Sequence, residues 1–109
     1  MPATSLGEFE VTVLLAILQL GDDVVGIRIR DEIERRSGRR ATRGAVYVTL
    51  DRLEDKGLLK SRLADASPER GGHPRRYFNV TPTGIKTLRH SLAMLGRMRA
   101  GLDAVLGKL

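Results

Sequence analysis

The fold is decided by residues 42–58, which read TRGAVYVTLDRLEDKGL. The apolar residues of this stretch follow one another at spacings of four and three, which puts them on one face of a helix. They are Val46, Leu50 and Leu53. Thr42 is a suitable N-cap, and Gly57 can adopt the left-handed conformation at which helices often end. The stretch therefore predicts one helix with a single buried face.

Two further helices are expected upstream. Residues 6–20 show the spacing of a buried helical stripe, with Ser5 as N-cap and Glu8 three residues later, as in a capping box. Residues 25–36 predict a second helix, which Gly38 follows as a C-terminal cap. The inward residues are Phe9, Val13, Ile17 and Leu20 in the first helix, widened by Leu14 and Leu18, and Ile29 and Ile33 in the second.

The hydrophobic period changes downstream of the decisive helix. Residues 58–63 and 75–80 alternate between apolar and polar side chains, as short strands do. Residues 64–74 between them contain two prolines and two glycines and predict a loop. The two strands would form a β-hairpin, which is marginally stable alone and needs a helix to pack on.

The last expected element is a helix over residues 81–109. Thr81 is a good N-cap, and Pro82 suits the first helical position. Apolar residues continue at spacings of three and four, so we expect the helix to run to the end of the chain. In an alternative interpretation, Gly96 and Gly101 break the helix and the tail folds back on its own domain.

Three helices followed by a hairpin is the element order of a winged helix-turn-helix. In that fold the third helix lies in the major groove of DNA and the hairpin is the wing. We therefore expect a mainly α protein with a small β-hairpin. It would consist of a winged helix-turn-helix over residues 1–80 and a long C-terminal dimerisation helix over residues 81–109, both in one compact unit.

The charge distribution favours a polyanionic partner. Lys and Arg number 19 against 13 Asp and Glu, a formal net charge of +6. Residues 1–27 contain no basic side chain, whereas two basic groups lie before the third helix and near the expected wing tip. These groups are Arg35, Arg36, Arg39, Arg40 and Arg43, and then Arg70, His73, Arg75 and Arg76. They lie where a winged helix meets phosphates, although they could also be two solvated surface clusters.

Candidate DNA contacts follow once the buried stripe of the third helix is subtracted. Arg43 could bond a guanine edge or a phosphate, and Ala45 and Val48 could touch a thymine methyl. Tyr47 either bonds DNA through its hydroxyl or packs in the core, and Arg52 could instead pair with a neighbouring acid. The expected contacts are Thr42, Arg43, Ala45, Tyr47, Thr49 and Arg52 in the helix, and Arg70, Gly72, His73 and Arg75 in the wing.

Over about residues 6–88, the chain resembles the PadR family of bacterial transcriptional regulators. The matching stretches are residues 44–58, GAVYVTLDRLEDKGL, and residues 71–84, GGHPRRYFNVTPTG. The combination of the helix pattern with the later Tyr-x-x-x-Thr-x-x-Gly is more specific than either half. The C-terminal part is similar to the short branch of the family. The chain differs where many members have Pro, at Val48, and where many have Tyr, at Ile27.

The resemblance implies a dimeric repressor on a palindromic operator, and it implies that Tyr47 contacts the DNA backbone. The apolar residues of the last helix lie beyond the reach of the three-helix core, so they predict a homodimer interface. Its expected residues are Leu92, Leu95, Met98, Leu102, Val105, Leu106 and Leu109. A small-molecule inducer of unknown identity would bind between the chains, near the first and last helices.

Other classes of function have little support. There is no cysteine, and the two histidines, His73 and His90, form no recognisable nucleophile–base pair or metal cluster, so we expect no catalytic residue, no metal and no cofactor. No signal peptide or membrane-length apolar run is visible, so we expect a cytoplasmic protein without a membrane partner. The remaining alternative is a winged helix that binds only proteins. It would not need arginines at both the helix start and the wing.

Overall fold

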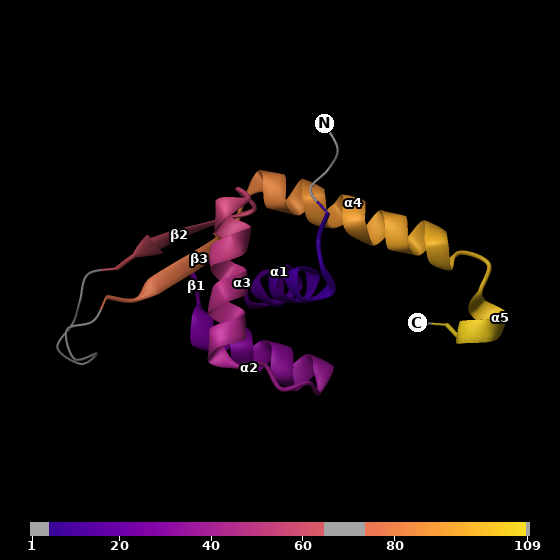
Figure 1. Ribbon diagram of the computed structural model, residues 1–109, viewed down its shortest axis with the longest axis horizontal. Coiled ribbons are helices and arrows are strands. Elements are labelled where there is room, and N and C mark those ends of the chain that lie inside the picture. The colour runs from indigo at the N-terminus through magenta and orange to yellow at the C-terminus, as the bar shows by residue number, and fades with distance from the viewer. Residues whose placement is uncertain (1–4, 65–73, 109) are drawn as a thin grey trace.

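The structure, a computed structural model, describes residues 5–64 and 74–108. A three-helix body carries a β-hairpin on one side and a long helix on the other (Figure 1). The elements in chain order are α1 (Glu8–Leu20), β1 (Val24–Val25), α2 (Gly26–Ser37), α3 (Arg43–Asp55), β2 (Leu59–Leu63), β3 (Arg76–Val80), α4 (Pro82–Arg99) and α5 (Asp103–Leu106). This is the winged helix-turn-helix order expected from the sequence.

The core lies where the first three helices meet the sheet. It is aliphatic except for Phe78, in keeping with the low aromatic content. The predicted stripe of α3 is fully buried at Val46, Leu50 and Leu53, and α2 buries Ile29 and Ile33 as expected. The stripe of α1 is only partly as predicted, because Leu18 is exposed while Ala16 is buried.

The hairpin belongs to a three-stranded sheet of order β1-β3-β2. β2 and β3 pair antiparallel with Ser61 opposite Phe78. The sequence did not predict β1, a two-residue strand in which Val24 pairs with Phe78. Two residues are too few to show a period, so only the packing of Val24 against the sheet reveals this strand.

Helix ends follow their predicted caps at α3 and α4 but not at α1. The hydroxyl oxygen of Thr81 accepts a hydrogen bond from Gly84 N at 2.9 Å, and Gly57 follows α3 with φ +77°. The predicted Ser5 cap is wrong, because α1 begins at Glu8 after Gly7. The N–H of Gly7 donates to Glu10 Oε1 at 2.9 Å, so Glu10 fills the role assigned to Glu8.

The predicted continuous helix from residue 81 to the chain end is wrong. α4 ends at Arg99, Ala100 is extended with ψ 134°, and Gly101 takes φ +84°. Gly96 stays inside the helix, so only the second glycine marks the break. The tail does not fold back either: no residue of α5 is buried, and Figure 1 shows it at the far end of α4.

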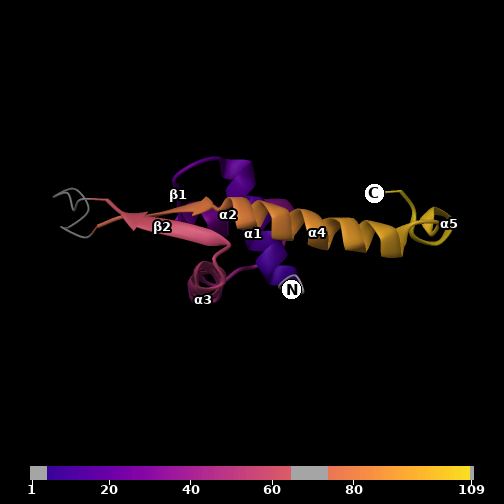
Figure 2. The ribbon, with the colours of Figure 1, turned by 90° about the horizontal axis from the view of Figure 1, so that it is seen from above.

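The wing and α4 extend in opposite directions from the three-helix body, as the view from above shows (Figure 2). The molecule accordingly measures 56 × 35 × 21 Å. The first turns of α4 hold it to the body through Gly84, Thr87 and Leu88, which are buried, whereas every later residue of α4 except Ser91 and Arg99 is exposed. The arrangement leaves α3 and the wing accessible together on one end.

Candidate nucleic-acid interface

The start of α3 is well defined. The hydroxyl oxygen of Thr42 accepts a hydrogen bond from Ala45 N at 3.1 Å and so satisfies one of the free N–H groups of the first turn. Because α3 buries a single stripe, its opposite face is open to solvent. Arg43, Ala45, Val48 and Arg52 are exposed there, and Val48 keeps 56% of its surface accessible.

Thr49 does not belong to this outer face, and its predicted outward orientation is wrong. It is only 6% exposed, and its hydroxyl donates to Ala45 O at 2.8 Å within the helix. At 100° per residue, Thr49 lies closer to the buried stripe than to the open face. The residue type alone could not show whether Thr49 is buried or exposed, because Thr is common at both kinds of helix position.

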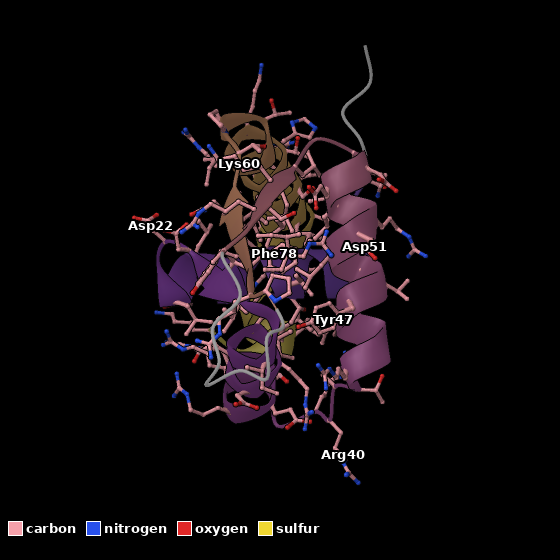
Figure 3. The ribbon with its side chains drawn as sticks, turned by 90° about the vertical axis from the view of Figure 1, so that its left-hand side faces the viewer. Asp22, Arg40, Tyr47, Asp51, Lys60 and Phe78 are labelled. Atoms are coloured by element: carbon pink, nitrogen blue, oxygen red, sulfur yellow. The ribbon has the colours of Figure 1, made fainter. Side chains whose placement is uncertain are left out.

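Tyr47 combines the two interpretations that the sequence left open. The ring is half-buried and packs against the start of α2, so close that a Cβ on Gly26 would lie 2.3 Å from the Tyr47 hydroxyl oxygen. Figure 3 shows Tyr47 directed from α3 toward the body, whereas Arg40 projects away from it. The guanidinium of Arg43 lies over the Tyr47 ring, 5.8 Å from its centre.

A basic groove of about 670 Å³ runs between the first turn of α2, the start of α3 and the loop end of β3. Four arginines and no carboxylate stand among the described residues that line it. The arginines are Arg28, Arg43, Arg75 and Arg76. Arg28 was not among the candidate contacts named from the sequence. Only the packing of α2 beside the wing brings this residue to the groove.

Much of the first basic group is already paired within the chain. Arg35 and Arg36 bind the buried carboxylate of Glu32, and Arg39 binds Glu8 at 2.7 Å. Hydrogen bonds from Arg36 and Arg35 favour the charged form of Glu32 more than burial opposes it. The pKa of the Glu32 carboxyl is therefore lowered. Of that group, Arg40 and Arg43 form no ion pair within residues 5–64 and 74–108.

The two neighbouring arginines of the wing differ. Arg75 is exposed, and its backbone oxygen accepts a hydrogen bond from Ala64 N at 2.8 Å. Arg76 is half-buried and forms ion pairs with Asp51 and Glu54 of α3. The other expected wing contacts, Arg70, Gly72 and His73, lie outside the described residues.

Other kinds of site find no support in the described residues. No group of three or more His, Cys, Asp or Glu there could hold a metal ion. No described helix combines the length and the apolar character needed to cross a bilayer.

Comparison with known proteins agrees with this geometry. The model of the transcriptional regulator PadR-like family matches residues 14–90. A PadR family regulator from Eggerthella lenta shares 25% identity at a TM-score of 0.69, covering 94% of this chain and 88% of its own. A PadR-like regulator from Bacillus cereus shares 21% identity at a TM-score of 0.70, and the match covers 93% of each chain. No curated protein sequence matches the chain.

A third structure, F93 from STIV, is described as a winged-helix DNA-binding protein. It shares 17% identity at a TM-score of 0.70 and covers 90% of this chain and 98% of its own. The likenesses to F93 and to the Bacillus cereus protein show the fold, and the family match spans the core, the recognition helix and the wing. The chain therefore belongs to the PadR-like family of transcriptional regulators.

Proposed function

We propose that this protein is a sequence-specific DNA-binding repressor that binds a palindromic operator as a homodimer. The observation that carries the proposal is the groove where the starts of α2 and α3 meet the loop end of β3, lined by Arg28, Arg43 and Arg75 beside the internally paired Arg76. Neutralising phosphates with arginine releases condensed counterions, which supplies much of the affinity of a protein for duplex DNA. Phosphate contacts at both elements would also fix the register of α3 in the major groove.

Base recognition is assigned to the exposed face of α3. Arg43 lies in the first turn, where a guanidinium can bond the O6 and N7 atoms of guanine. Ala45 and Val48 offer apolar contact to the 5-methyl group of thymine. Thr42 and Arg52 flank these residues and would bind phosphates.

The wing would hold the backbone beside the major-groove contacts. We assign phosphate contacts to Arg75 and to Arg70 and His73, with Gly72 allowing close approach of the chain to the duplex. Tyr47 helps to line the same groove, and its hydroxyl would bond a phosphate there. These assignments leave Arg76 aside, since its guanidinium is already bonded within the chain.

A homodimer is supported by the apolar side chains that α4 and α5 leave exposed. These are Leu92, Met94, Leu95, Met98, Leu102, Val105 and Leu106, with exposures from 40% to 79%. Burial of such a side chain contributes roughly 1.5–3 kcal/mol, so a second copy that covers the row would be favoured. Leu109, the last expected interface residue, lies outside the described residues.

The proposal is tested by gel shift with genomic fragments, including the promoter of the protein's own gene. We expect specific binding to a palindrome, with a log–log salt slope on the order of −5 or steeper. A reporter placed behind the selected fragment should be expressed less when the protein is present. Binding to no fragment, or binding that salt leaves unchanged, would instead favour a winged helix that contacts only proteins.

Induction is assigned to a hollow of about 450 Å³ between the start of α1 and α4. Val11, His90 and Leu95 help to line it, beside the apolar row that a second copy would cover. A small molecule bound there could change the separation of the two recognition helices. A compound that releases DNA from the wild type should fail on Val11→Trp, which fills the hollow, but act on Leu15→Trp outside it. Equal release from both variants would contradict this assignment.

A further inference from the structure

Every nitrogen of the Arg76 guanidinium donates a hydrogen bond, two of them to α3 and the third to the neighbouring strand β2. Nη1 donates to Asp51 Oδ1 at 2.9 Å and Nη2 to Glu54 Oε1 at 2.6 Å. Nε donates to the Ser61 hydroxyl oxygen at 3.1 Å, and that hydroxyl lies 2.8 Å from Glu54 Oε1. The guanidinium also lies over the ring of Phe78, 4.7 Å from its centre. We call these five residues the wing clamp.

The wing clamp connects α3 to both strands of the wing, a link that the hydrogen bonds between β2 and β3 do not provide. Arg76 is the first residue of β3, Ser61 lies on β2, and Asp51 and Glu54 are one turn apart on α3. Phe78, which supports the guanidinium, is fully buried in the core. The clamp therefore braces both wing strands against the helix that would read the bases.

Glu54 and Arg76 of the wing clamp are held in their charged forms near neutral pH. Burial of the Glu54 carboxyl favours its neutral form, but hydrogen bonds from Ser61 and Arg76 outweigh this and lower its pKa. Burial likewise opposes the charge of Arg76, but the bonds to Asp51 and Glu54 raise its pKa. Arg75, one residue earlier, has the same charge without ion pairs to described residues, and thus provides a matched control.

We propose that Arg76 is a positioning residue that sets the angle between the wing and α3, and that it does not act as a phosphate contact. The inference rests on the proposed DNA-binding function. A two-stranded hairpin is marginal alone, so its direction depends on what braces it. Phosphate contacts at the wing and base contacts at α3 can be made together only when the two elements are held at the right separation.

The wing angle can be measured without DNA. The chain has no cysteine, so spin labels can be placed specifically at Leu63→Cys on β2 and Asp55→Cys on α3. Dilution with excess unlabelled chain leaves one labelled copy in each dimer. We expect one narrow distance distribution for this protein and for Arg75→Met, and a broadened or shifted one for Arg76→Met. Arg76→Lys, which can no longer bond all three partners, should fall between them.

A second variant separates positioning from simple charge. Asp51→Asn with Glu54→Gln raises the net charge by two, while Arg76→Met lowers it by one. Positioning predicts that both broaden the distance distribution. It also predicts that both lower, by roughly ten-fold or more, the preference for the selected genomic duplex over random duplex of the same length. Arg75→Met should instead weaken both duplexes about equally and reduce the magnitude of the salt slope by about two, one for each copy in the dimer. Thermal unfolding checks that each variant is folded.

Two outcomes would overturn the inference. One is an unchanged distance distribution in both clamp variants. The other is a result in which the charge-raising variant binds its duplex with improved discrimination while Arg76→Met behaves like Arg75→Met. If the wild type binds no duplex at all, the proposed function fails, and the distance measurements still decide whether Arg76 sets the wing angle.

Discussion

Two glycines of this protein are required by packing at close approaches, without any unusual backbone angle. A Cβ on Gly84 would lie 2.2 Å from the backbone oxygen of Leu58, where the start of α4 crosses the start of the wing. A Cβ on Gly26 would instead meet the side chain of Tyr47. The first neighbour is backbone and cannot move alone, whereas the second can rotate away.

The two alanine substitutions should therefore separate stability from binding. Gly84→Ala is expected to lower the free energy of unfolding by roughly 1–3 kcal/mol, since backbone must shift. Gly26→Ala should cost less stability but displace Tyr47 and weaken DNA binding. Urea unfolding and gel shifts measure the two effects. Gly44→Ala, where the added Cβ meets nothing within 4 Å, is the control and should not destabilise the fold. Equal stability losses at Gly26 and Gly84 would refute the distinction.

Arg43 should carry sequence information that the wing arginine does not. Arg43→Ala is expected to cost roughly 1–3 kcal/mol on the operator and to relax one base position. Arg75→Ala should weaken all sequences about equally. Arg35→Ala is a suitable control, because that guanidinium already binds Glu32 at 2.8 Å, and it should leave affinity nearly unchanged. Binding measured across a set of single-base operator variants decides between these outcomes. If both Arg43→Ala and Arg75→Ala keep full affinity for the operator, DNA must bind a different surface of the protein.

Among the elements, α1 and α3 are tied at their ends by an ion pair. Lys56, just after α3, donates to Glu10 Oε2 at 2.7 Å, while the other oxygen of Glu10 caps the start of α1. Burial of Glu10 favours its neutral form, yet the bonds from Lys56 and Gly7 outweigh this and hold its pKa below the ordinary 4.5. The Glu10 carboxylate thus stabilises both the start of α1 and the end of α3.

The depressed pKa of Glu10 predicts acid sensitivity. Below pH 4.5 the unfolded chain takes up the proton first, so the stabilisation from Glu10 is fully present above that value and is lost as pH falls through the folded pKa. Glu10→Gln should lower stability at neutral pH and make stability depend less on pH in the acid range. Unfolding measured from pH 7 down to about pH 3 tests this. Glu8→Gln is the control, because its pair with Arg39 is exposed and such pairs contribute roughly 0–1 kcal/mol. Parallel pH profiles for wild type and Glu10→Gln would contradict the assignment.

At the scale of the whole molecule, the proposed DNA-binding face and the proposed dimer interface occupy opposite ends. The wing and α3 lie at one end, and α4 and α5 extend from the other (Figure 1). The exposed apolar row lies along this second part. A two-fold axis through that row would leave both recognition helices free. Such a dimer could set them about 34 Å apart, one turn of duplex, over the halves of a palindrome.

Sedimentation tests this assembly directly. The full chain should be a dimer at micromolar concentration, and both Leu95→Glu and a truncation after Arg89 should be monomeric, because each removes apolar surface from the proposed interface. Leu63→Glu is the matched control: Leu63 is also an exposed leucine, at 65%, but lies on the wing, so this variant should stay dimeric. A monomeric wild type, or a dimer that survives the truncation, would place the interface elsewhere.

The element order was predictable because it depends on short-range periodicity. The stripe of Val46, Leu50 and Leu53, the Thr81 cap and the two hairpin strands were each predicted from neighbouring residues, and the structure confirms them. The end of α4 was not predictable in this way, because small differences in local free energy decide whether the helix continues through Ala100 and Gly101. Gly96 and Gly101 look alike in sequence, yet only Gly101 adopts positive φ.

The sequence by itself determined the fold class, the recognition helix and the basic character of the chain. Only the tertiary structure decided which arginines are available to DNA. Arg76 is bonded to α3, Arg39 binds Glu8 of α1, and Arg28 joins the groove from α2. The physical reason is that a guanidinium takes whichever carboxylate the packing of distant elements brings within about 3 Å. Residues such as Asp51 and Arg76, 25 positions apart, have no local pattern that marks them as partners.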